Sequence, residues 1–210
     1  EGNFSPLPMK CVDTGAGLER FAMILQNRAS IHEIDQYAAP YQLINQRIGD
    51  TVWSRIILDH LKTSILMIRE GIAPSNTREG YLLRRALRRA MIGVYLRGIN
   101  LTILQEWVDS LSDVIDNKDL TFRQKSVIAH WLGEERDSFK RLMRRSRKYL
   151  DKIIATKELD AQQAFTLKTG IGIPEDLLEE FCARHDIPFP KAEFLKLIEE
   201  HRNISRRPKK

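Results

Sequence analysis

The chain has 210 residues, which is enough for one large domain or two small ones with a hydrophobic core. Hydrophobic residues make up 42% of the chain, which excludes a disordered protein, and the net charge of +6 favours a polyanionic partner. No apolar run is long enough to cross a membrane, and no signal peptide is recognised. Cys11 and Cys182 lack the spacing of a metal site or disulfide framework, so we expect no metal site and a reducing compartment.

The first part of the chain combines short apolar runs with turn residues. A mixed run at residues 9–12 predicts a terminal β-strand, and an amphipathic helix is expected to end near Gln26. Between them, Gly15 and Gly17 would let the backbone turn sharply and approach a ligand. A helix that starts just after them would direct its free N–H groups at that ligand.

Two charged residues flank these glycines. Asp13 could hold an ammonium group, and Arg20 could hold a phosphate through its planar guanidinium group. Two glycines before a helix are weak evidence by themselves, because a strand-to-helix turn without a ligand is the more common explanation.

Helical spacing becomes clear after a loop and short helix expected at residues 29–50. Apolar residues recur every three or four positions over residues 52–69, which predicts a helix. His60 lies one turn from both Ile56 and Ser64. No second His or Cys lies at metal-ligand spacing from it, so a hydrogen-bonded core histidine is favoured.

Residues 71–90, GIAPSNTREGYLLRRALRRA, predict a turn followed by a strongly basic helix. Pro74 fixes the turn, and Asn76 is a good helix N-cap, with Glu79 three residues later as in a capping box. One face of the helix is apolar, and the opposite face carries Arg84, Arg85, Arg88 and Arg89.

Arginines one helical turn apart repel each other, and Glu79 is the only acidic residue between Gly71 and Gly98. We therefore predict that this face binds an external anion, since guanidinium groups match phosphate oxygens well. The alternative is a merely solvated face, although a solvated face typically mixes both charge signs.

Helices are also expected at residues 101–115, at 121–132 and 134–155 as one or two long helices, and at 194–201, with a turn at 117–119. The second long helix has a further basic face, formed by Arg141, Arg144, Arg145, Arg147 and Lys148. Acidic Glu134, Glu135 and Asp137 are interpreted as lying at its start, where the helix dipole favours them.

The segment FTLKTGIG at residues 165–172 interrupts the helical period. Its threonines, isoleucine and two glycines predict an extended strand or an irregular loop. Pro174 is then expected at the first position of the next helix, where its missing N–H is not needed.

Three stretches together resemble the class II aminoacyl-tRNA synthetases in their alanyl form. VDTGAGLER at residues 12–20 resembles motif 3. Residues 71–90, with the preceding Asp59 and His60, resemble the helical tRNA-recognition region, and FTLKTGIGIPEDL at 165–177 resembles the stretch that follows it. The order and spacing of the three agree across nearly the whole chain.

The resemblance implies a mainly α fold. Residues 51–210 would form a helical bundle for tRNA recognition, and residues 1–50 would be the C-terminal part of an α/β aminoacylation domain, with its terminal strand and helix. The whole enzyme would use ATP with Mg to attach alanine to tRNA(Ala), in the cytoplasm or alternatively in mitochondria. Motifs 1 and 2 are absent, so this piece alone is expected to be inactive.

The resemblance also implies residue roles. Asp13 would face the amino group of alanine, Gly15 and Gly17 would shape the adenylate pocket, and Arg20 would contact an ATP phosphate. Asn76 would approach the G·U pair of the acceptor stem. The other implied tRNA-binding residues are Arg78, Arg84, Arg85, Arg88, Arg89 and Thr169, and some of these arginines are open to packing within the domain instead.

Two positions depart from the family pattern. Thr169 stands where the family usually has an Asp that helps to recognise the G·U pair, and Glu79 stands where it usually has Arg, with Arg78 one place earlier. Asn76 can cap its helix or contact a base, and it can hardly do both fully with one amide. The alternatives to a ligase segment are a non-catalytic helical RNA-binding module and a protein-interaction domain whose basic faces meet acidic partners.

Overall fold

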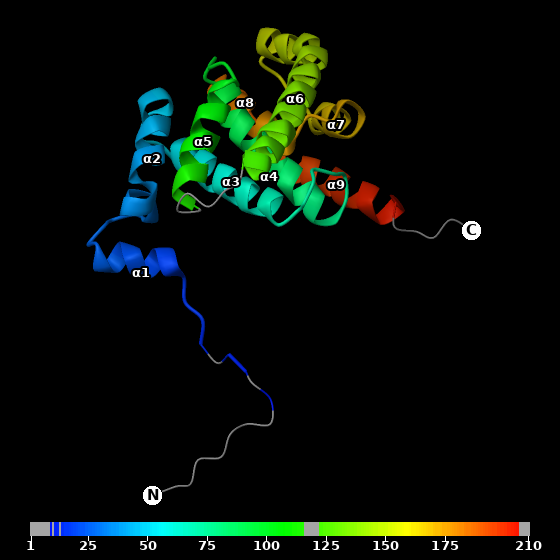
Figure 1. The fold of residues 1–210 in the computed structure, drawn as a ribbon. Coiled ribbons are helices and arrows are strands. Elements are labelled where there is room, and N and C mark those ends of the chain that lie inside the picture. The colour runs from blue at the N-terminus through cyan, green and yellow to red at the C-terminus, as the bar shows by residue number, and fades with distance from the viewer. Residues whose placement is uncertain (1–8, 10, 13, 116–121, 206–210) are drawn as a thin grey trace, which may run out of the picture.

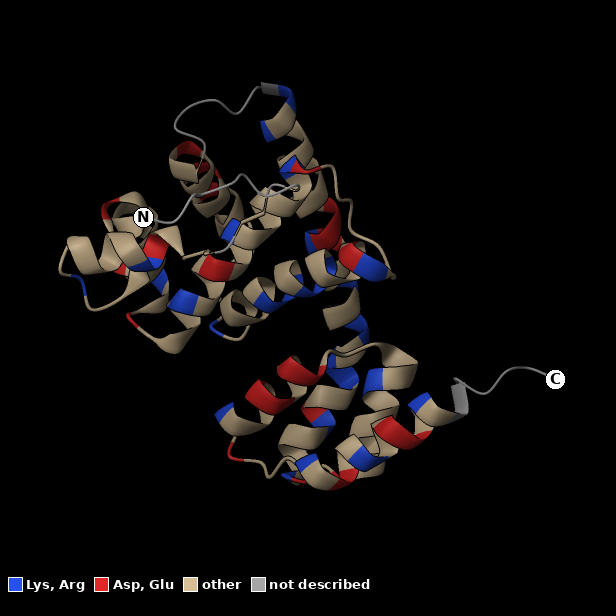
Figure 2. Cartoon of the chain, turned by 90° about the horizontal axis from the view of Figure 1, so that it is seen from below, with Lys and Arg blue, Asp and Glu red and all other residues tan. Residues whose placement is uncertain are grey.

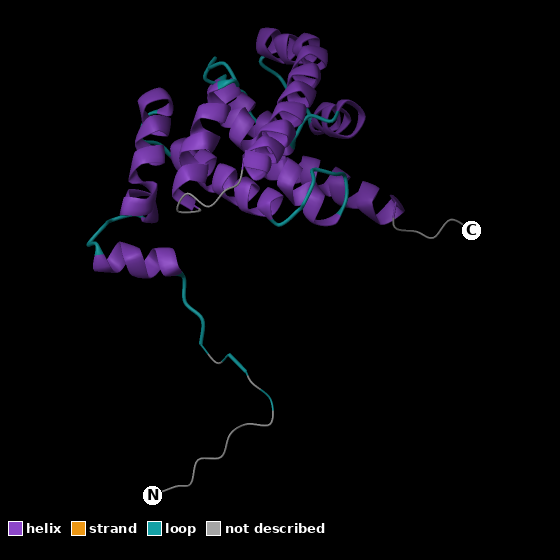
Figure 3. Cartoon of the chain, in the orientation of Figure 1, coloured by secondary structure: helices purple, strands orange, loops and turns teal. Residues whose placement is uncertain are grey.

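The computed structural model describes residues 9, 11–12, 14–115 and 122–205, apart from the side chains of Phe122, Ile204 and Ser205. These residues form a bundle of helices and contain no strand (Figures 1 and 3). In chain order the elements are α1 (Leu18–Leu25), the 3₁₀ helix η1 (Ile31–Glu33), α2 (Asp35–Ile48), α3 (Val52–Arg69), α4 (Arg78–Tyr95), α5 (Ile103–Ile115), α6 (Phe122–Thr156), α7 (Ala161–Thr166), the π-helix η2 (Leu167–Ile171), α8 (Glu175–Arg184) and α9 (Lys191–Ser205).

The predicted mainly α bundle is confirmed, and the described residues do not form the expected terminal strand. Met9, Cys11 and Val12 are described and lie outside any strand, whereas Asp13 and the turn expected at 117–119 lie outside the described residues. Helix α3 has the predicted bounds, and Pro174 is the N-cap of α8 rather than its first helical residue. None of the helices in the described part of the chain has the length and apolar composition needed to span a bilayer.

The long helix α6 changes the interpretation of its acidic residues. It runs without a break over 35 residues, so Glu134, Glu135 and Asp137 lie in its interior and not at its start. The helix dipole therefore does not explain them. One of them, Glu135, is buried, and its role is described with the groove below.

The predicted strand or loop at residues 165–172 is wrong, because this segment is helical. The side chain of Asp160 accepts a hydrogen bond from the Gln163 N–H at 2.7 Å, which starts α7, and η2 continues the helical path. Leu167 is buried and its carbonyl accepts the Gly172 N–H at 3.0 Å. Packing of the segment therefore overrides the β propensity of its threonines and isoleucine, and Gly172, at φ +89°, ends the helical path.

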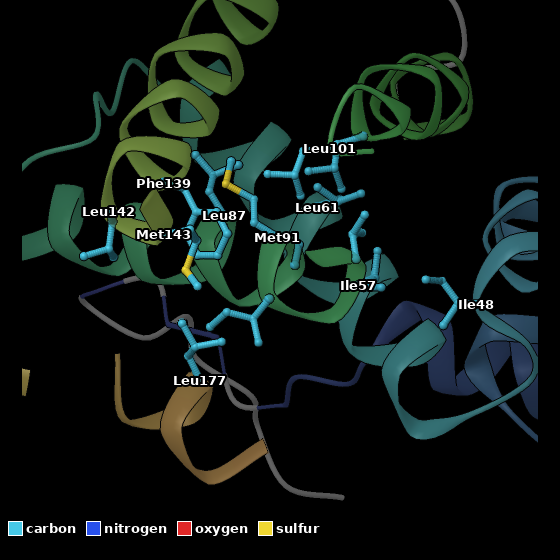
Figure 4. Close-up of a cluster of buried hydrophobic side chains, with 14 of the residues drawn as sticks. Ile48, Ile57, Leu61, Leu87, Met91, Leu101, Phe139, Leu142, Met143 and Leu177 are labelled. Carbon is cyan, nitrogen blue, oxygen red and sulfur yellow. The ribbon is translucent and has the colours of Figure 1, made fainter. Parts of the chain in front are cut away.

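Helices α3 and α4 pack along each other at the centre of the bundle, with α2, α5 and α6 against them. Gly93 permits the close contact of the central pair, because a Cβ there would lie 2.6 Å from Cε3 of Trp53. Side chains from α3, α4, α6 and α8 meet in one apolar cluster (Figure 4). The labelled members on these helices are Ile57, Leu61, Leu87, Met91, Phe139, Leu142, Met143 and Leu177.

Helix α1 lies at the edge of the bundle and has no buried residue (Figure 1). Glu19 ties it to the bundle, since its Oε1 accepts hydrogen bonds from Tyr37 Oη and from Lys62 Nζ, both at 2.8 Å. Burial alone would raise the pKa of Glu19, but these two hydrogen bonds outweigh it and lower that pKa. Four apolar residues of α1 stay exposed, namely Leu18, Phe21, Ile24 and Leu25.

Candidate nucleic-acid interface

A groove of about 450 Å³ lies between the basic helix α4 and the segment from η2 to the start of α8. Its walls include Asn76 and four arginines of α4 on one side, and residues 168 and 172–176 on the other. The structure thus brings together two stretches that the sequence singled out separately, which are about 90 residues apart.

The turn before α4 is held against the first turn of that helix. The Ser75 N–H donates to the Gly80 carbonyl at 3.1 Å. Gly80 is buried, and a Cβ there would lie 2.5 Å from the Ala73 carbonyl oxygen. Only glycine permits this close approach, so Gly80 fixes the turn that carries Asn76 into the groove.

Asn76 does not cap α4, contrary to the prediction. The N-cap is Thr77, and no side chain accepts a capping hydrogen bond there. Instead, Nη1 of Arg84 donates to the side-chain oxygen of the exposed Asn76. Nε of Arg84 lies 3.2 Å from Oε1 of Glu135, whose side chain is 11% exposed. A buried carboxylate on α6 thus orients an arginine, and that arginine orients the amide in the groove.

Most of the α4 arginines have acidic partners on other helices. Arg88 donates from Nε to Oε2 of Glu135 at 3.2 Å, and Arg89 pairs with Asp176 of α8. The sequence shows Glu79 as the only acidic residue near this face, whereas in the folded chain α6 and α8 supply acidic partners to three of its arginines. Arg85 differs from the other three, because it is exposed and makes no ion pair or hydrogen bond within the described residues.

Two of the predicted tRNA-binding residues, Arg78 and Thr169, are not among the residues that line the groove. Arg78 is exposed at the first position of α4. The Thr169 hydroxyl donates to the Phe165 carbonyl at 2.8 Å, one turn back in its own helix. Its neighbour Lys168 does line the groove and forms an ion pair with Glu175 at 2.6 Å.

Sequence reasoning missed several groove residues, namely Tyr81, Lys168, Asp176 and Arg202, together with Glu135 behind the arginines. Lys168 is an isolated charge in the sequence, and Asp176 stands beside Glu175 with no sign of a basic partner. Arg202 lies on α9, where helical spacing gives no sign of a shared site. Glu135 could have been noticed as an acid beside a strongly basic run, but its partner helix is not evident from the sequence.

His60 lies behind the groove on α3 and is half-buried. It is hydrogen-bonded to the backbone of Ile56, which agrees with the predicted hydrogen-bonded histidine. Burial lowers the pKa of His60, and the positive charge of Arg89 lowers it further. Within the described residues, no group of three or more His, Cys, Asp or Glu side chains is placed to hold a metal ion.

The glycine turn before α1 is exposed. Neither Gly15 nor Gly17 has a positive φ, so the backbone conformation alone does not require glycine at either position. Arg20 is exposed and has no ion pair among the described residues. Asp13, the residue predicted to face an amino group, lies outside the described residues.

A helical bundle with a groove rich in arginine and lysine has the features of an RNA-binding domain. The family described as tRNA synthetases class II (A) has a model that matches residues 1–210. The chain therefore belongs to this family of class II aminoacyl-tRNA synthetases, the ligases that join amino acids to tRNA for translation. Membership implies tRNA, an amino acid and ATP as partners in general.

Proposed function

We propose that this chain belongs to an alanine–tRNA ligase and that its groove receives the acceptor stem of tRNA(Ala). The observation that carries the proposal is the placing of Asn76 opposite residues 172–176 across one basic groove. Both sides of the groove come from stretches that resemble the alanyl enzymes, and Arg85, which has no ion pair among the described residues, would contact a phosphate there.

Asn76 is the residue best placed to contact a base. Its carbonyl oxygen accepts one hydrogen bond from Arg84 and has a second lone pair to offer. In an A-form stem the shallow minor groove is the accessible one, and a wobble pair exposes an amino group there. The side-chain oxygen of Asn76 would accept a hydrogen bond from that amino group. Thr169 would approach the same minor groove of the RNA with the oxygen of its hydroxyl.

The N-terminal part of the chain would serve the amino acid and ATP in the whole enzyme. We propose that Arg20, exposed in the first turn of α1, contacts an ATP phosphate and that Gly15 and Gly17 leave room for the adenylate. Asp13 would hold the amino group of alanine. In the whole enzyme Mg would bind together with ATP, and we assign it no ligand in this chain.

The proposal is tested by binding two acceptor-stem duplexes that differ only in G·U or G·C at one pair. The wild type should prefer the G·U duplex, and Asn76→Ala should lose about 1–3 kcal/mol of this preference, by analogy with base contacts in DNA. Gln46→Ala removes an exposed amide from α2 and serves as the matched control. Equal preference in wild type and Asn76→Ala would contradict the proposed role of Asn76.

A further inference from the structure

Helix α6 carries an unusual concentration of positive charge in its middle. Residues 136–148 contain seven Lys or Arg and one acid, Asp137. Five of these cations recur at positions i, i+1, i+4, i+5 and i+8, so they share one face of the helix. We call this face the α6 stripe, and its members are Lys140, Arg141, Arg144, Arg145 and Lys148.

The stripe faces away from the core and is unpaired. All five side chains are exposed, and none makes an ion pair or hydrogen bond within the described part of the chain. The other two cations of this run do have acidic partners, because Arg136 pairs with Asp137 at 3.5 Å and Arg147 with Asp151 at 3.7 Å. The opposite face of α6 is buried and holds the stripe in place, through Leu142, Met143, Ser146 and Leu150.

A hydrogen bond links the stripe's surroundings to the groove. A hollow of about 540 Å³ on α6 is lined by Arg141, Arg144, Arg145 and Ser138. The hydroxyl of Ser138 accepts a hydrogen bond from Nη2 of Arg88 at 3.3 Å, and Arg88 also lines the groove. A polyanion in the groove could therefore continue over Ser138 onto the stripe.

The number of cations alone does not distinguish this surface, because basic and acidic segments are interspersed over much of the molecule (Figure 2). The distinguishing feature is that none of the five side chains has an acidic partner among the described residues, in contrast with Arg84, Arg88 and Arg89 on α4. Uncompensated cations one turn apart repel each other, and an external anion would relieve that repulsion.

We propose that the α6 stripe is a second RNA-binding surface, which holds the phosphate backbone of the tRNA whose stem enters the groove. This inference rests on the proposed function for the identity of the RNA. The stripe spans eight residue steps, or about 12 Å at 1.5 Å per residue, which matches roughly three phosphates at the spacing of a duplex strand. Its contacts go to phosphates, so they add affinity without sequence preference.

The test compares two triple variants of the 210-residue chain that remove the same charge. The stripe variant is Arg141→Gln, Arg144→Gln, Arg145→Gln, and the control is Arg47→Gln, Arg123→Gln, Lys196→Gln, on exposed positions elsewhere. Binding of a tRNA(Ala) transcript is measured as a function of salt. Loss of three phosphate contacts should lower the salt slope by about 2–3 units in the stripe variant, and the control should keep most of the wild-type slope.

Two further measurements make the outcome specific. A variant with Lys instead of Gln at positions 141, 144 and 145 should keep the wild-type salt slope, because counterion release depends on the charge of the side chain and not on the shape of the guanidinium group. The ratio of binding to the G·U and G·C duplexes should stay at the wild-type value in every stripe variant. A wild type without G·U preference would refute the proposed function, while the salt slope on tRNA would still test the stripe.

A stripe variant with the same salt slope as the control, and with an unchanged melting temperature, would overturn the inference. If the stripe variant keeps the salt slope of the control on tRNA but no longer binds phosphatidylserine vesicles that the wild type binds, the inference is also overturned, and the stripe is assigned to a lipid surface. Because all three substituted side chains are exposed, we expect both triple variants to fold as the wild type does.

Discussion

Glu135 is the acid on which the geometry of the groove depends, and its removal is the sharpest test of that geometry. Its two carboxylate oxygens each lie 3.2 Å from an arginine, Arg84 on one side and Arg88 on the other. Glu135→Gln keeps the size of the side chain and one acceptor but removes the negative charge. Both arginines would then face each other without a counter-charge.

The size of the effect follows from how little solvent screens this cluster. The exposed fraction is 11% for the Glu135 side chain, 22% for Arg84 and 17% for Arg88. Removing one partner of a fully buried ion pair costs about 3–5 kcal/mol, and the remaining acceptor and partial exposure reduce this to about 2 kcal/mol, the range of one hydrogen bond to a charged group. For a chain of this length we expect the melting temperature to fall by about 4–8 °C.

The assay is thermal and urea unfolding of Glu135→Gln beside Glu134→Gln, which removes an exposed neighbouring acid that has no ion pair within the described residues. The control should melt within about 1–2 °C of the wild type, as exposed substitutions usually do. Glu135→Gln should also bind RNA more tightly overall and prefer G·U less, because Arg84 would leave Asn76 for phosphate. If both variants melt at the wild-type temperature, the Glu135 cluster contributes no stability and the reasoning fails.

Two more predictions test the frame of the groove. Gly80→Ala should destabilise the fold by about 1–3 kcal/mol and weaken G·U preference, because its Cβ would meet the Ala73 carbonyl. The control Gly133→Ala, whose Cβ would lie at an ordinary contact distance of 4.0 Å from Nη2 of Arg136, should melt no lower than wild type. Burial and Arg89 lower the pKa of His60 in the folded chain, so on acidification His60 is protonated at a higher pH in the unfolded chain than in the folded chain. The free energy of unfolding should therefore fall as the pH drops below about 6.5. Unfolding free energies at pH 7.5 and 5.5 check this, and an equal pH dependence in His60→Gln would contradict it.

The helices were predictable where the apolar spacing is strong and local. Helix α3 has the bounds that its spacing predicts, because one continuous face of it is buried against α4. The segment 165–172 was mispredicted for the opposite reason. Its composition favours a strand, but the Asp160 cap starts a helix just before it, and Leu167 within it is buried in the core.

The candidate site was predictable in its cations and not in their partners. The arginines of α4 and the amide of Asn76 are evident from the sequence, and the groove does contain them. The acidic partners are not evident, because Glu135 follows Arg88 by 47 residues and Asp176 follows Arg89 by 87. Helical periodicity describes neighbours within a helix and carries no information on which helices meet.

Ion pairs between acids of one helix and arginines of another decide which cations stay available to RNA. By sequence, α4 has Glu79 in its first turn as its only acidic residue, and α6 has Glu134, Glu135 and Asp137 beside its own cations. In the folded chain, the carboxylate of Glu135 faces α4 and forms ion pairs with two arginines there, Arg84 and Arg88. The α6 stripe is thereby left without that counter-charge, while α4 keeps Arg85 as its one groove arginine with no ion pair within the described residues. The helix that looked compensated therefore has more unpaired charge to offer a phosphate backbone than the helix that looked most basic.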